Sequence, residues 1–120
     1  MSNNKLATSN NHFSKGDIFK MNPNPTKGHE QSGYRPFVVL SEDLQKFSPH
    51  MLRIAPITSS DGKYPLHVPL ETEYGVITDG VILCEHERTV DIMAYANTFK
   101  ILDKVTDICM KECLKIIDSF

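Results

Sequence analysis

From Gly16 onward, short apolar runs alternate with polar segments that contain proline, glycine and asparagine. Runs of about four to eight residues rich in β-branched and aromatic side chains predict β-strands. The predicted strands cover residues 17–21, 36–40, 51–58, 66–70, 76–84 and 88–93. The run Pro36–Leu40, PFVVL, is apolar throughout and therefore predicts a buried strand.

The segments between these strands predict turns and loops. Residues 22–34 form a long polar loop, and Asp61-Gly62 is a strong hairpin-turn signal. Residues 41–47 predict a short helical turn with Ser41 as its N-cap.

A helical period appears at the end of the chain. Thr106 predicts an N-cap, and Val105 and Met110 occupy the two positions of a hydrophobic staple. One face follows the i, i+3, i+4, i+7 spacing of a buried helix face and consists of Met110, Cys113, Leu114 and Ile117. Short strands followed by one terminal helix predict an α+β domain, in which a small antiparallel barrel or sheet carries the helix.

The length of 120 residues corresponds to one domain. Residues 1–14 have no apolar period and predict a mobile N-terminal arm, so the domain is expected to cover residues 15–120. No apolar run approaches the roughly 20 residues of a membrane span, and the N-terminus lacks the apolar segment of a secretory signal. These features predict a cytoplasmic protein without membrane contact.

Three cysteines, Cys84, Cys109 and Cys113, are an odd number without a CxxC pair, which argues against a disulfide framework and a zinc site. We expect them to be small core residues. Residues 1–67 carry eight Lys/Arg and five Asp/Glu, and residues 68–120 carry five and ten, so the halves have charges of +3 and −5. A surface for nucleic acid is therefore expected mainly in the first half.

The loop PTKGHEQSGYRP collects groups that can bind a phosphate. Pro36 favours an extended Arg35 at the edge of a sheet, where a guanidinium can hold a phosphate by two parallel hydrogen bonds. Lys27 and His29 add charge nearby, and Glu30 can accept a proton or orient Arg35. A solvated polar loop with a surface ion pair is the commoner interpretation of such residues, and both interpretations stay open.

Two further segments carry polar groups at strand ends. IAPITSS ends in hydroxyls, of which Thr58 and Ser59 can donate to phosphate oxygens, although turn hydroxyls more often bond their own backbone. CEHERTVD places Glu85, His86 and Arg88 between two strands, a set able to transfer protons or simply a charged connection. No GxSxG elbow, P-loop or HExxH motif occurs.

In order and spacing, these segments resemble the PemK/MazF toxin family over about residues 16–118. The resemblance rests on GHEQ-x-G-x-RP, then P-x-T, then the CEHERTVD block, and on the closing helix. It implies an SH3-like small antiparallel β-barrel with a C-terminal helix, the PemK/CcdB-like plasmid toxin fold, usually as a homodimer.

The resemblance further implies a sequence-specific endoribonuclease that cleaves single-stranded mRNA without a metal or other cofactor. The 2′-hydroxyl of the substrate attacks the adjacent phosphate and leaves 2′,3′-cyclic phosphate and 5′-hydroxyl ends. Cleavage inhibits translation and growth, and a cognate antitoxin with a disordered tail neutralises the toxin. Contact with DNA is expected only through the antitoxin.

The same resemblance assigns roles to individual residues. Arg35 matches the family arginine at the phosphate, and Thr58 matches the hydroxyl that partners it. Glu30 matches an acid that orients the arginine or helps proton transfer, and Glu85 matches the general base of the PemK branch. Residues matching positions that line the RNA site are His29, Gln31, Ser59 and Arg88, and Lys27, His86 and Tyr95 are expected to bind RNA beside them.

Two residues depart from the family pattern. Leu83 stands where the PemK branch has an arginine proposed as general acid, and Tyr95 stands where many relatives have a groove arginine. Leucine cannot donate a proton, and three alternatives stay open. Arg35 and Thr58 suffice for cleavage, or His86 or His29 acts as the general acid, or the toxin has a weakened activity. Tyr95 can stack on a base or serve as an interface or core aromatic.

Two rival functions follow. One is a CcdB-like gyrase poison on the same fold, but such proteins use a C-terminal tryptophan, and this chain has no tryptophan. The other is a catalytically weakened relative that only binds RNA, which Leu83 and Tyr95 motivate.

Overall fold

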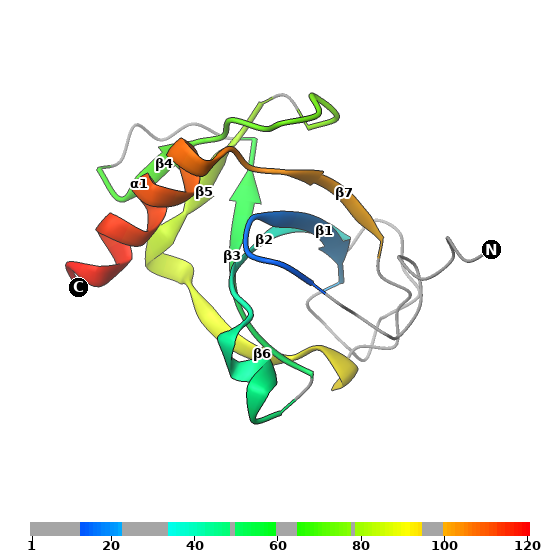
Figure 1. Cartoon of the computed structure of the whole chain (residues 1–120). Coiled ribbons are helices and arrows are strands. Elements are labelled where there is room, and N and C mark those ends of the chain that lie inside the picture. The colour runs from blue at the N-terminus through cyan, green and yellow to red at the C-terminus, as the bar shows by residue number, and fades with distance from the viewer. Residues whose placement is uncertain (1–12, 23–33, 49, 60–64, 78, 95–99) are drawn as a thin grey trace.

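The computed structural model describes residues 13–22, 34–48, 50–59, 65–77, 79–94 and 100–120. Its strands form one antiparallel sheet in the order β4-β5-β3-β2-β1-β7, and β6 pairs with β3 off this path. The strands are β1 (Asp17–Met21), β2 (Arg35–Ser41), β3 (Met51–Thr58), β4 (His67–Pro69), β5 (Val81–Leu83), β6 (Arg88–Asp91) and β7 (Ile101–Lys104). The sheet curls into a half-barrel (Figure 1), which confirms the predicted α+β architecture.

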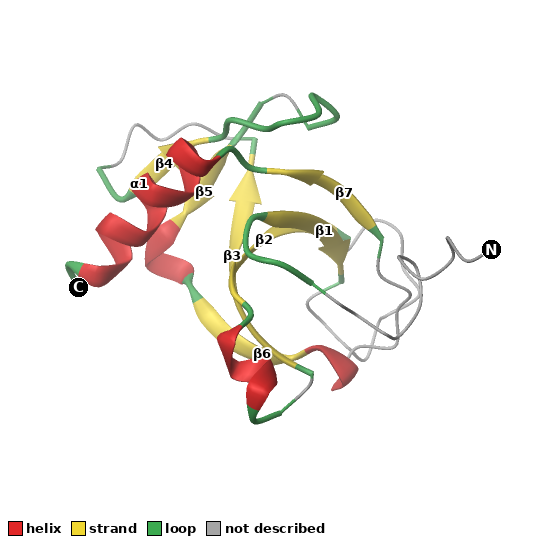
Figure 2. Ribbon diagram, viewed as in Figure 1, coloured by secondary structure: helices red, strands yellow, loops and turns green. Residues whose placement is uncertain are grey.

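The helical elements connect the strands and close the chain (Figure 2). In the described ranges, the 3-10 turns are η4 (Asp43–Lys46), η5 (Cys84–His86) and η6 (Ile92–Ala94), and the α-helix is α1 (Asp107–Asp118). Helix α1 packs against β4 and η5. The hydroxyl of Thr106 accepts a hydrogen bond from the backbone N–H of Cys109 at 3.2 Å, so the predicted N-cap is confirmed. In the described part of the chain, no helix is long and apolar enough to cross a membrane.

Both faces of the central strand β2 are buried, which explains its continuous apolar run. Val38 and Leu40 join a cluster that includes the inner face of α1. Phe37 and Val39 point to the opposite face and join a second cluster around Phe19. Alternate residues of a strand face opposite sides of its sheet, so one strand contributes to both cores. The three cysteines lie in the first cluster, buried and free, as predicted.

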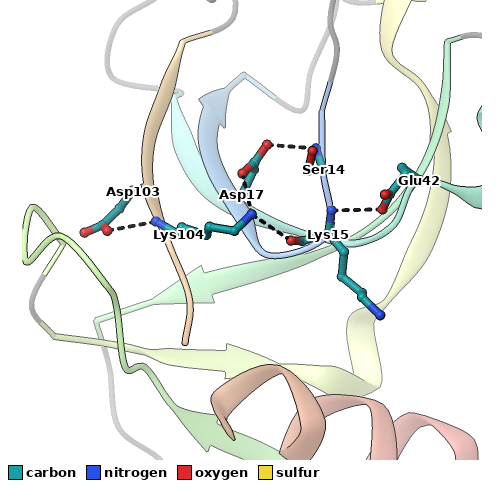
Figure 3. Close-up of polar contacts among 6 residues, drawn as sticks. All are labelled: Ser14, Lys15, Asp17, Glu42, Asp103 and Lys104. Atoms are coloured by element: carbon teal, nitrogen blue, oxygen red, sulfur yellow. Dashed lines mark hydrogen bonds and ion pairs between the residues drawn. The ribbon is translucent and has the colours of Figure 1, made fainter. Parts of the chain in front are cut away.

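A lysine on β7 holds the beginning of β1 (Figure 3). The Nζ atom of Lys104 lies 3.2 Å from Oδ1 of Asp17 and donates to the carbonyl oxygen of Lys15 at 3.0 Å. The other carboxylate oxygen of Asp17 accepts from the backbone N–H of Ser14 at 2.8 Å. The predicted N-terminal arm lies mostly outside the described residues and stays a prediction. Of its last residues, Phe13 is buried against Phe19, with ring centroids 4.9 Å apart.

Several predicted elements are corrected. The strand predicted over residues 76–84 is a strand only at Val81–Leu83, because the backbone N–H groups of Val76 and Ile77 donate to the carboxylate of Asp103 instead of a sheet partner. Strand β7 was not predicted at all. The strand predicted over residues 88–93 ends at Asp91 and continues as η6.

The predicted turn after β2 also differs in its cap. The hydroxyl of Ser41 accepts from the backbone N–H of Asp43 at 3.1 Å, but Ser41 is the last residue of β2, and Glu42 takes the N-cap position without a side-chain bond. The Asp61-Gly62 turn and most of the loop predicted over residues 22–34 lie outside the described residues.

Candidate active site

Arg35 and Thr58 lie at the ends of two neighbouring strands. Arg35 begins β2, and Thr58 ends β3. The strands are antiparallel with Phe37 opposite Pro56, and the same register continued by two residues places Arg35 opposite Thr58. Cross-strand partners project from the same face of a sheet. The guanidinium and the hydroxyl therefore start from neighbouring positions on one face of the sheet.

These two residues line an open pocket of about 290 Å³, here called the Arg35–Thr58 pocket. Its lining residues are Lys20, Tyr34, Arg35, Pro36, Ile57, Thr58, Ser59, Ile77 and Asp79. Two cations and one carboxylate give the pocket an excess of positive charge. Among the described residues, Arg35 forms no ion pair within 4.0 Å, and its side chain is exposed. The pocket can therefore hold an anion between a guanidinium and a hydroxyl.

A second pocket of about 380 Å³, here called the His86 pocket, is lined by Phe37, Pro56, Leu83, His86 and Arg88. Phe37 lies two residues after Arg35 on β2, and Pro56 lies two residues before Thr58 on β3. Both therefore lie on the same face of the sheet as Arg35 and Thr58. Two residues of a strand span roughly 7 Å. The two pockets are therefore neighbours along β2 and β3.

Glu85 lies behind the His86 pocket, between two imidazoles. Its Oε2 atom is 2.9 Å from Nε2 of His67 on β4 and 3.6 Å from Nε2 of His86. An ionised carboxylate only accepts hydrogen bonds, so Nε2 of His67 carries the proton in this contact. The Oε1 atom is buried and has no hydrogen-bond partner among the described residues.

Burial of Glu85 raises its pKa, but opposing interactions outweigh burial. The hydrogen bond from His67, a hydrogen bond from its own backbone N–H, and the charges of His67 and His86 all favour the carboxylate form. The net result is a pKa of Glu85 below its ordinary value. Glu85 is therefore a carboxylate at neutral pH.

The predicted site residues fall into three groups. Arg35, Thr58 and Ser59 share the first pocket, and His86 and Arg88 share the second, with Glu85 next to it. The other predicted site residues lie outside the described residues and stay predictions, namely Lys27, His29, Glu30, Gln31 and Tyr95.

Sequence reasoning missed four polar residues at or near the two pockets. Lys20, Tyr34 and Asp79 line the Arg35–Thr58 pocket, and His67 contacts Glu85. Lys20 was visible as a cation after the apolar pair Ile18-Phe19, but only the pairing of β1 with β2 brings it to Pro36. His67 reaches Glu85 through the pairing of β4 with β5, for which the chain has no local signal.

Known proteins resemble this chain in sequence and in fold. Residues 14–120 match the family described as PemK-like, MazF-like toxin of type II toxin–antitoxin systems. The chain is 35% identical to endoribonuclease EndoA of Bacillus subtilis over 96 residues, which cover 77% of each protein. It is 38% identical to endoribonuclease MazF of Staphylococcus saprophyticus over 81 residues, which cover 64% of this chain and 67% of that protein.

Solved structures show the same fold. A crystal structure of MazF from Deinococcus radiodurans superposes with a TM-score of 0.70 at 27% identity and covers 89% of this chain and 94% of its own. A MazE–MazF structure from the same organism gives a TM-score of 0.69 at 22% identity, over 89% of this chain and 92% of that one. With the family match over residues 14–120, these likenesses show that the chain belongs to the PemK/MazF family of type II toxin–antitoxin toxins.

Proposed function

We propose that this MazF/EndoA-type endoribonuclease toxin cleaves single-stranded RNA through the 2′-hydroxyl of the substrate itself. The observation that carries the proposal is that Arg35 at the start of β2 and Thr58 at the end of β3 line one open, positively charged pocket. When the 2′-oxygen attacks phosphorus, the new bond closes a 2′,3′-cyclic phosphate, and the bond to the 5′-oxygen breaks. The protein must hold the phosphate in line and stabilise the charge that develops on it.

Arg35 and Thr58 are suited to that task. A guanidinium binds two phosphate oxygens in parallel and keeps its charge throughout the reaction. A threonine hydroxyl adds a donor without adding charge. Ser59 supplies a second hydroxyl in the pocket, and Glu30 is proposed to orient Arg35 or to help proton transfer.

The His86 pocket is proposed to take the neighbouring nucleotide. Phe37, Pro56 and Leu83 give it apolar walls, and Arg88 gives it a cation. Bases stack on apolar and guanidinium surfaces, while phosphates follow positive charge. Lys27, His29, Gln31 and Tyr95 are proposed to contact RNA beyond the two pockets.

We propose that a cognate antitoxin neutralises the chain by placing a disordered tail in the groove formed by these pockets. The structures that resemble this chain include an endoribonuclease in complex with its cognate antitoxin from a mycobacterial species. We further propose a homodimer, and contact with DNA only through the antitoxin. Cleavage of mRNA would stop translation and growth until antitoxin is supplied.

Cleavage of a long unstructured RNA with analysis of the new ends tests the proposal. We expect 5′-hydroxyl ends, which accept a phosphate from a kinase without prior phosphatase, and 3′ ends blocked by a cyclic phosphate. Arg35→Ala should lower the rate by roughly 10²- to 10³-fold, as for removal of a group that stabilises developing charge. Arg53→Ala is the matched control, because it removes a guanidinium from the adjacent strand β3. The side chain of Arg53 pairs with Glu87 and lines neither pocket.

The result that would overturn the proposal is a folded Arg35→Ala protein that cleaves at the wild-type rate. Binding of RNA without turnover by the wild-type chain would support the weakened relative instead. A DNA supercoiling assay run in parallel tests the gyrase-poison alternative, for which we expect no effect.

A further inference from the structure

Three titratable side chains form a row from the sheet to the His86 pocket. His67 on β4 contacts Oε2 of Glu85 at 2.9 Å, and the same oxygen lies 3.6 Å from Nε2 of His86. Exposure of the side chains rises along the row, from 15% for His67 to 25% for Glu85 and 62% for His86. The outermost imidazole is therefore accessible from solvent, while the inner pair is largely buried.

Glu85 is poorly suited to take the proton from a 2′-hydroxyl. Its lowered pKa makes it a weak base, and an efficient proton acceptor titrates near the working pH. Neither carboxylate oxygen is well placed to reach a 2′-hydroxyl, since Oε1 is buried and Oε2 faces the two imidazoles. A carboxylate in this position stabilises a neighbouring imidazolium instead.

His86 stands where a proton donor is missing. It shares its pocket with Leu83, which has no proton to give, and this pocket adjoins the Arg35–Thr58 pocket along β2 and β3. Imidazole is the side chain whose charge change falls between pH 5 and 8. A protonated imidazole beside the phosphate pocket can therefore protonate a leaving oxygen.

We propose that three side chains work together, here called the relay, although only one of them transfers a proton. His86 is the general acid, and Glu85 stabilises its imidazolium. His67 is a positioning residue that holds Glu85 in place. This inference rests on the proposed function. As the bond from the 2′-oxygen to phosphorus forms and the bond to the 5′-oxygen breaks, the imidazolium of His86 gives its proton to the 5′-oxygen. The proton of the 2′-hydroxyl passes to water, and water reprotonates His86, so protons and electrons balance.

Two charged side chains and several apolar ones face His86. Glu85 of η5 contributes negative charge and Arg88 of β6 positive charge, while the contributions from β2, β3 and β5 to this pocket are apolar. Arg53 on β3 does not line this pocket and is paired with Glu87 through contacts of 2.8 and 2.9 Å. Glu85 is therefore the carboxylate placed to hold the imidazolium of His86, and Glu85→Gln should slow cleavage.

A pair of substrates isolates the acid step. One carries the normal 5′-oxygen at a single cleavage site, and the other carries sulfur in that bridging position, because a thiolate leaves without protonation. His86→Ala should slow single-turnover cleavage of the oxygen substrate by about 10²-fold or more, yet leave the sulfur substrate within about threefold of wild type. Arg35→Ala should slow both substrates equally, because it acts on the phosphate charge.

His67 is tested with a conservative variant. His67→Gln keeps an N–H donor for Glu85 and should stay close to wild type on both substrates. His67→Leu removes the donor and should slow the oxygen substrate roughly tenfold, with the sulfur substrate spared, because misplacement of a catalytic group lowers the rate. Circular dichroism and thermal melts of both variants check that each is folded.

The outcomes separate this inference from the proposed function. If Arg35→Ala slows both substrates but a folded His86→Ala slows neither, or slows both equally, the relay is wrong and the phosphate site stands. If His67→Gln and His67→Leu lose the same activity on both substrates, His67 is a structural residue rather than a positioning one. If Arg35→Ala cleaves normally, the proposed function itself fails.

Discussion

The Oδ2 atom of Asp103 accepts a hydrogen bond from the backbone N–H of Ile77 at 3.0 Å. Three more backbone N–H groups donate to the same carboxylate, those of Tyr74, Val76 and Lys104, at 2.8 to 2.9 Å. Asp103 is buried, with only 1% of its surface exposed. Because Ile77 lines the Arg35–Thr58 pocket, a carboxylate on β7 shapes the rim of the candidate active site.

Asp103→Asn should destabilise the fold strongly. One carboxylate oxygen becomes an NH2 group, which faces two backbone N–H donors and can accept from neither. Loss of charge-assisted bonds at a buried site costs about 2–4 kcal/mol, and the urea midpoint at pH 7 measures it. Asp118→Asn makes the same isosteric change at an exposed position at the end of α1, and it should leave the midpoint nearly unchanged. Equal midpoints for the two variants would contradict the role of Asp103.

Stability should fall in acid, and Asp103 should cause part of that fall. Burial raises the pKa of Asp103, but the hydrogen bonds from the four N–H donors together lower it by more than burial raises it. The pKa of Asp103 in the folded state therefore lies below its value in the unfolded state. The stabilisation is then present above the unfolded pKa, near pH 4, and is lost as the pH falls through the folded pKa. Glu85, whose pKa is also lowered, contributes in the same direction. Urea midpoints from pH 7 to pH 2.5 should decline less steeply below pH 4 in Asp103→Asn than in wild type.

These bonds also explain where prediction from sequence failed. The predicted strand begins at Val76, but Asp103, 26 residues beyond Ile77, takes the backbone donors of Val76 and Ile77. Strand β7, Ile101–Lys104, was missed because four residues without a turn signal become a strand only by pairing with β1. In contrast, β1 and β3 were predicted with their observed bounds, since their side-chain patterns are local.

The residues of the candidate site also divide into those with a local signal in the sequence and those that depend on strand pairing. Arg35 and Thr58 could be named as candidates because each lies at a strand end marked by its neighbours in sequence and matches a motif of the family that the chain resembles. Lys20 and His67 could not be, since their approach to the pockets depends on strand pairing and register.

Gly80→Ala should disturb Thr58 through its backbone. Gly80 has φ of +131°, and a Cβ atom there would lie 3.0 Å from the carbonyl oxygen of Thr58 and 3.2 Å from Cγ2 of Ile57. We expect a loss of about 1–3 kcal/mol in stability and roughly a tenfold lower cleavage rate, because Thr58 must shift. Both are measured by urea unfolding and single-turnover kinetics.

Gly75→Ala is the matched control for Gly80→Ala. Gly75 also has a positive φ, +72°, but a Cβ atom would meet nothing within 4 Å. It should cost about 1 kcal/mol of stability for its backbone conformation and leave the cleavage rate unchanged. A normal rate in Gly80→Ala would show that the position of Thr58 tolerates this contact.

Lys20→Ala should weaken RNA binding without changing the chemical step. Lys20 is exposed on β1 and lines the Arg35–Thr58 pocket, so it is placed to contact a phosphate next to the one that is cleaved. We expect a several-fold higher KM, an unchanged kcat, and a slope of log affinity against log salt that is smaller by about 1. Lys46→Ala removes an exposed lysine from η4, outside both pockets, and should preserve the salt slope. An unchanged slope in Lys20→Ala would place Lys20 outside the RNA path.

Strand β3 pairs with three other strands, β2, β5 and β6, and it carries Thr58 at its end. Opening β3 therefore requires most of the sheet to open, so its backbone amides should exchange with deuterium only through global unfolding. Toxicity and folding should then be lost together on heating, with no partly unfolded form that is harmless yet still recognisable as native. Partial unfolding of the toxin therefore cannot limit its toxicity in the cell, and control of toxicity depends on the supply of antitoxin.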